Sequence, residues 1–143
     1  MYLETLPTTL PLQNFSRFTG PILDPQRWPF DFTLLPPSTF LVGGSVRDAL
    51  LGRKSDHLDL DFVMPEKAVE TARAIATRHK AGFVLLDAER NIARVVFEGA
   101  TADFAQQVGD SLDADLWRRD FTVNAIAYNP RTKELFDPLG GLR

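Results

Sequence analysis

The chain has 143 residues, 44% of them hydrophobic, with 16 basic and 19 acidic side chains for a net charge of −3. This length supports one domain with one sizeable core, and no stretch resembles a signal peptide or a membrane span, so we expect a cytoplasmic protein. The absence of cysteine excludes disulfides, thiolate metal sites and a cysteine nucleophile, and two histidines are too few for a histidine metal site.

The first 38 residues differ in composition from the rest of the chain. Seven of the ten prolines lie within the first 37 residues, which disfavours regular secondary structure there. The aromatic residues in this stretch argue against complete disorder, because such side chains normally cover a surface. We expect an irregular lead-in over 1–38 and a folded domain over 39–143.

An apolar run at 40–42 predicts a short buried strand that ends at Gly43 and Gly44. Glycines allow a close approach to the backbone that a side chain would block. Apolar residues then recur at helical spacing over 45–51, so the free N–H groups of a helix would face the glycines and suit a phosphate. Arg47 in the first turn could bind the same anion. The alternative is a simple tight turn.

Apolar and acidic residues alternate over 57–64, which predicts a strand with one face in a core. Asp59 and Asp61 share the other face. Like charges about 6 to 7 Å apart along a strand repel each other, so a bound cation best explains them. Magnesium takes oxygen ligands and bridges carboxylates to substrate phosphates. The alternative is a solvated strand face whose acids discourage edge pairing.

The middle of the chain contains the remaining regular elements. A proline at 65 and apolar residues at helical spacing predict a helix over 65–80. Period-two patterns and turn residues predict strands over 83–86, 92–97, 100–105, 126–128 and 134–136. The dipeptide Glu98-Gly99 would join two of these strands in a hairpin and could place Asp103 beside the strand that carries Asp59 and Asp61.

The stretch 111–128 begins as a capped helix with acids in its first turn and then contains Arg118 and Arg119. Adjacent helical side chains point about 100° apart, so the two arginines serve different partners. One could face a ligand phosphate while the other pairs with Asp115 or Asp120. The alternative is an ordinary surface ion-pair cluster.

Four segments in this order carry a resemblance to a known family: LVGGSVRDALLGR, DLD, DLWRRDFTVNAIAY and FDPLGG. Together they resemble the catalytic head of class II tRNA nucleotidyltransferases and bacterial poly(A) polymerases, and the match covers about residues 39 to 143. The resemblance implies an α+β fold of the polymerase-β-like nucleotidyltransferase type, with a mixed or antiparallel sheet flanked by helices. It also implies transfer of CMP or AMP from CTP or ATP to a tRNA or other RNA 3′ hydroxyl, with release of pyrophosphate.

The resemblance assigns roles to individual residues. Asp59 and Asp61 would be catalytic and would hold two magnesium ions. Nucleotide contacts would come from Gly43, Gly44, Arg47, Arg119 and Asn124. Two-metal sites usually use a third carboxylate, and Asp103 is the best candidate for it, although a solvent-facing strand acid is the alternative.

Two features keep other functions open. A net charge of −3 is unexpected for a protein that grips RNA, and the family's base-reading neck would lie beyond Arg143, so we expect a head fragment that presents the metal site without choosing a base. Only 106–110 separates the Asp103 strand from the next helix, where many members that build the full CCA end carry a longer loop. This shortness keeps open a poly(A) polymerase or a partial-end adding enzyme, and a truncated, non-catalytic nucleotide-binding remnant is a further alternative.

Overall fold

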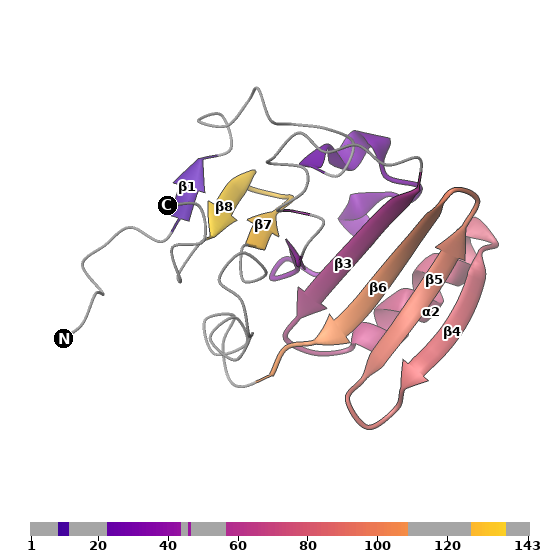
Figure 1. Ribbon diagram of the computed structural model, residues 1–143. Helices are drawn as coiled ribbons and strands as arrows, with labels where there is room; N and C mark the ends of the chain where they lie inside the picture. Colours follow the sequence, from indigo (N-terminus) through magenta and orange to yellow (C-terminus); the bar gives the residue numbers. More distant parts are fainter. Residues whose placement is uncertain (1–8, 12–22, 44–45, 47–56, 109–126, 137–143) are drawn as a thin grey trace.

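The computed structural model describes residues 9–11, 23–43, 46, 57–108 and 127–136 of the chain. These residues form a mixed sheet of eight strands in the order β1-β8-β7-β2-β3-β6-β5-β4 (Figure 1). The strands are β1 (Thr9–Pro11), β2 (Phe40–Val42), β3 (Leu58–Met64), β4 (Gly82–Asp87), β5 (Ile92–Phe97), β6 (Ala100–Gln106), β7 (Ala127–Asn129) and β8 (Glu134–Phe136). The helix α2 (Ala68–His79) packs on β4, β5 and β6. The predicted α+β fold is confirmed.

The strand pairing places distant segments next to each other at the centre of the sheet. β3 and β6 are parallel neighbours, and β5 and β6 form the predicted antiparallel hairpin. Its turn contains Gly99 with φ of +74°, a left-handed conformation that glycine adopts at little cost. In the β3–β6 register Asp61 lies opposite Asp103, so the predicted neighbourhood of these two strands is confirmed.

Two elements differ from the expectations. The lead-in contains an unexpected strand, β1, which pairs with β8 at one end of the sheet. A proline such as Pro11 is tolerated in this edge strand, because the N–H groups on its outer side have no neighbouring strand to bond. The helix expected from residue 65 begins only at Ala68, after Lys67 in a left-handed conformation. The Asn91 side chain accepts a hydrogen bond from the Val69 N–H at 2.9 Å, so a distant turn caps this helix.

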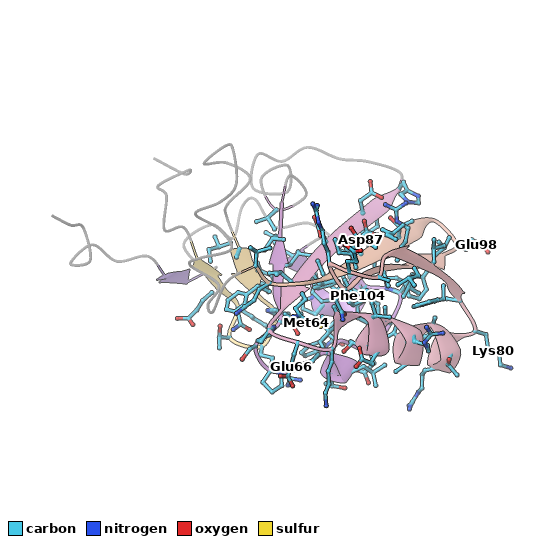
Figure 2. All side chains as sticks on the ribbon, turned by 90° about the horizontal axis from the view of Figure 1, so that it is seen from below. Met64, Glu66, Lys80, Asp87, Glu98 and Phe104 are labelled. Atoms are coloured by element: carbon cyan, nitrogen blue, oxygen red, sulfur yellow. The ribbon has the colours of Figure 1, made fainter. Side chains whose placement is uncertain are left out.

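An aromatic cluster holds the centre of the core. Phe62 of β3 stacks on Phe104 of β6 with a centroid distance of 5.3 Å, and Trp28 meets Phe62 edge-on at 5.2 Å. Figure 2 shows Met64 and Phe104 on the side of the sheet that α2 covers. Because Trp28 and Phe30 are buried in the same cluster, part of the lead-in covers this sheet. The division of the chain at residue 38 stays a prediction.

Tyr128 in β7 is fully buried, and its hydroxyl has no hydrogen-bond partner among the described residues. Burial, assisted by the charge of Asp24, raises the pKa of Tyr128 to about 12. We expect Tyr128→Phe to increase the free energy of unfolding by about 1 kcal/mol, because it removes an unsatisfied buried group. Urea unfolding at neutral pH measures this difference, and a loss of stability in the variant would contradict it.

The same substitution changes the alkaline pH dependence of stability. The pKa of a tyrosine is about 10 in the unfolded chain, and that of Tyr128 in the folded protein is about 12. Between these two pH values the unfolded state binds fewer protons than the folded state. The stability of the wild type therefore falls as pH rises through this range. We expect a shallower fall for Tyr128→Phe over the same range.

Candidate active site

Two carboxylates project from one face of β3. The alternation predicted for this segment is confirmed, since Leu60 and Phe62 are 2% and 0% exposed while Asp59 is exposed and Asp61 half-buried. The apolar face is held in the core by the aromatic cluster, so both aspartates are directed to the opposite face of a strand that lies inside the sheet. This arrangement concentrates negative charge on a rigid support.

Hydrogen bonds orient the Asp59 carboxylate. The Thr101 hydroxyl donates to Asp59 Oδ1 at 2.9 Å, and His57 Nε2 lies 3.2 Å from the same oxygen. Thr101 lies directly opposite Asp59 in the β3–β6 register. The Thr101 contact therefore follows from the strand pairing, whereas the His57 contact is local, because His57 lies two residues before Asp59 in the chain. Both contacts restrict the rotation of the carboxylate.

Gly43 brings the end of β2 close to Asp61. Its φ of +87° is left-handed, and a Cβ added at this position would lie 3.2 Å from Asp61 Oδ2. The Val46 N–H donates to the Gly43 carbonyl oxygen at 3.2 Å, which turns the chain immediately after the strand. A side chain at this position would therefore crowd the Asp61 carboxylate, while the expected approach of a phosphate to the two glycines stays a prediction.

Asp103 is bound by an arginine that the sequence analysis did not identify. Arg94 of β5 donates from Nε to Asp103 Oδ1 at 2.7 Å and from Nη2 to Oδ2 at 3.0 Å. The hydrogen bonds to Asp103, followed by its charge, raise the pKa of Arg94 above its ordinary value, with smaller contributions from Asp59 and Asp61. The two-residue turn of the β5–β6 hairpin places Arg94 opposite Asp103. Counting residues outward from Glu98-Gly99 along the two strands could therefore have predicted this pair.

The third-carboxylate role of Asp103 stays a prediction. Both of its oxygens accept hydrogen bonds from Arg94. Within the described ranges, no three His, Cys, Asp or Glu side chains are grouped closely enough to hold a metal ion. The predicted nucleotide-contacting residues Gly44, Arg47, Arg119 and Asn124 lie outside the described residues. Apart from Val46, so does the helix predicted over 45–51, and so does the helix predicted to begin at residue 111.

Asp59 and Asp61 are chemically suited to magnesium. This ion is usually bound by one or two carboxylates together with substrate phosphates and waters, rather than by a complete set of protein ligands. Two oriented carboxylates on one strand face match that requirement without a third acid. A magnesium ion held by these carboxylates could in turn bind a phosphate group of a ligand.

Comparison with known proteins agrees with this geometry. The family model described as the poly(A) polymerase head domain matches residues 39–110 and 92–143. The CC-adding tRNA nucleotidyltransferase of Synechocystis sp. is 63% identical over 117 residues, which are 82% of this chain and 28% of that protein. The CC-adding tRNA nucleotidyltransferase of Geobacter sulfurreducens is 48% identical over 104 residues, or 71% of this chain and 24% of that protein.

A solved structure extends the similarity to nearly the whole chain. The structure of a CCA-adding enzyme in complex with CTP superposes with a TM-score of 0.72 at 30% identity, and it covers 96% of this chain and 34% of that one. The chain thus spans about a quarter to a third of the length of the proteins that it matches.

Proposed function

The chain belongs to the poly(A) polymerase head-domain family, and we propose that it is the catalytic head of an RNA nucleotidyltransferase that extends the 3′ end of tRNA. In this reaction the terminal 3′ hydroxyl attacks the α-phosphorus of a nucleoside triphosphate. A new phosphodiester bond forms, the bond to the β-phosphate breaks, and pyrophosphate leaves. The observation that carries the proposal is the pair Asp59 and Asp61 on one face of β3, with the Gly43 turn against Asp61.

We propose CMP as the transferred group. The relatives from Synechocystis sp. and Geobacter sulfurreducens are both named CC-adding enzymes. The short connection after the Asp103 strand is compatible with a partial-end adding enzyme, because many full CCA-adding members of this family carry a longer loop there. Addition of AMP, either to a CC end or as a poly(A) tail, is the alternative.

The chain's own residues would bind and orient the reactants. Asp59 and Asp61 would hold magnesium, which lowers the pKa of the attacking hydroxyl and offsets charge on the leaving pyrophosphate. Thr101 and His57 would keep the Asp59 carboxylate in its binding orientation. In-line transfer needs positioning more than covalent help, so a rigid β3 is a suitable support.

The remaining contacts are proposed by family resemblance. Gly43, Gly44 and Arg47 would surround the nucleotide, Arg119 would bind its triphosphate, and Asn124 would support the sugar.

No helix in the described part of the chain is long and apolar enough to cross a membrane. We propose a cytoplasmic location, where tRNA ends are built.

Magnesium-dependent binding and transfer test this function. We expect the purified chain to bind CTP in calorimetry with magnesium and to lose this binding in a chelator, because the triphosphate needs the ion to approach the two aspartates. Labelled CTP and a tRNA that lacks its 3′ CCA end should then give only weak, slow labelling of the tRNA, because the isolated head is expected to present the metal site without choosing a base. Absence of magnesium-dependent binding would refute the proposal. Binding without transfer would favour the non-catalytic nucleotide-binding alternative.

A further inference from the structure

Among the described residues, Arg94 lies on the face of the sheet that carries Asp59, Asp61 and Asp103, which we name the carboxylate face. The strands β3, β4, β5 and β6 contain a single Lys or Arg, which is Arg94. We infer that Arg94 binds a phosphate group of the substrates in the proposed reaction, and that Asp103 holds its guanidinium ready for this contact. The inference rests on the proposed function, and it assigns a substrate-binding role to Arg94 and a positioning role to Asp103.

The strand register places Arg94 beside the two catalytic carboxylates. Asp61, Asp103 and Arg94 lie opposite one another on three adjacent strands, so their side chains share one face of the sheet. Neighbouring strands are about 4.8 Å apart, which puts the Arg94 backbone about 10 Å from that of Asp61. A side chain as long as arginine therefore borders the place where the phosphates would gather.

The Arg94 guanidinium is fixed on one edge and available on another. Nε and Nη2 each donate to one oxygen of Asp103. A guanidinium has five N–H donors, and no acceptor among the described residues bonds Nη1. The Arg94 side chain as a whole is 42% exposed, so a ligand can reach it from solvent. Because Asp103 already restricts the side chain, binding a phosphate would cost little additional conformational entropy.

The negative charge of the carboxylate face provides a second reason to assign a phosphate to Arg94. The phosphates of any substrate would be repelled by Asp59, Asp61 and Asp103 together, and a fixed cation on the same face reduces this repulsion. A purely structural role, in which Arg94 only neutralises Asp103, makes a different prediction. In that case Arg94 could be removed without a loss of ligand affinity once Asp103 has also been removed.

The phosphate could come from two sources. One is a phosphodiester of the RNA close to its 3′ end, and the other is the triphosphate of the incoming nucleotide. Both present oxygens that match the guanidinium edge. Separate titrations with RNA and with CTP distinguish them.

A double-mutant cycle tests the inference, with Arg94→Met, Asp103→Asn and the double variant compared to the wild type. Circular dichroism checks that each variant folds, and the double variant leaves no unpaired charge to destabilise it. We expect Arg94→Met and the double variant to bind one ligand, either tRNA without its CCA end or magnesium-CTP, about tenfold more weakly. Asp103→Asn should show a smaller loss, because the guanidinium remains but is less well oriented.

Salt dependence separates a phosphate contact from a structural effect. If the ligand is RNA, removal of Arg94 should reduce the slope of log affinity against log salt by about 0.7 for a single strand, while Asp103→Asn should leave the slope unchanged. Wild-type affinity for both ligands in the double variant would overturn the inference and leave the proposed function intact. A wild-type chain that binds neither ligand would overturn both.

Discussion

Replacing Asp61 by Asn is expected to reduce the proposed CMP transfer by at least about 100-fold, because removal of even an outer-shell partner of a metal ligand costs about 10- to 100-fold. In the proposed site the carboxylates of Asp59 and Asp61 on β3 would be the magnesium ligands, and an amide is a much weaker ligand for this ion. Single-turnover transfer of labelled CMP to tRNA without its CCA end measures the rate. Calorimetry should show loss of magnesium-dependent CTP binding.

Folding should be affected little by the same substitution. Asp61 lies next to Asp59 on β3 and opposite Asp103 on β6, so loss of its charge relieves repulsion. We expect the free energy of unfolding in a chelator to change by no more than about 1 kcal/mol. Asp87→Asn, at the far edge of the same sheet, is the matched control and should retain transfer. A large loss of stability in Asp61→Asn would show a structural aspartate and refute its assignment as a metal ligand.

Phe62→Ala is expected to cause the largest loss of stability among single changes to β3. Phe62 is 0% exposed and contacts Trp28 and Phe104 in the aromatic cluster. Truncation of a buried phenylalanine costs about 3 to 5 kcal/mol, a large part of the about 5 to 15 kcal/mol that a domain of this kind has. Thermal and urea unfolding measure the effect. Transfer should fall together with the folded fraction, because Phe62 anchors the strand that carries Asp61.

Two other substitutions calibrate this result. Phe62→Leu keeps most of the apolar volume and should cost less than Phe62→Ala. Val84→Ala, on β4 with 44% exposure, should change the free energy of unfolding by about 0.5 kcal/mol or less. Equal effects of Phe62→Ala and Val84→Ala would contradict the view that the aromatic cluster holds the centre of the sheet.

Local patterns in the sequence were enough to predict most elements of the fold. The alternation over 57–64 corresponds to β3, and the strands expected over 92–97 and 134–136 have the same bounds as β5 and β8. These predictions succeed because a strand with one buried face requires a period of two. The position of the two β3 aspartates on the other face follows from that same requirement.

Contacts between distant segments could not be predicted in this way. The β1–β8 pair, the Asn91 cap of α2 and the burial of Trp28 against Phe62 each join residues that are far apart along the chain. None of them leaves a periodic signal in its own segment. The proline-rich composition of the lead-in also concealed its strand, because an edge position removes the usual penalty for proline.

The sequence by itself determined the family, the α+β class and the two acids on one strand face, because each depends on residue types at short, regular spacing. Only the tertiary structure decided which groups surround those acids. Thr101 meets Asp59, Gly43 meets Asp61, and Arg94 binds Asp103 through the registers of separate strand pairs. A shift of one residue in any of these registers would turn the side chains to the opposite face. The turn of the β5–β6 hairpin sets the pairing of Arg94 with Asp103 locally. The registers that bring Thr101 and Gly43 to the β3 aspartates are set by burial of the whole apolar face at once, and so no single segment contains the information that specifies those two contacts.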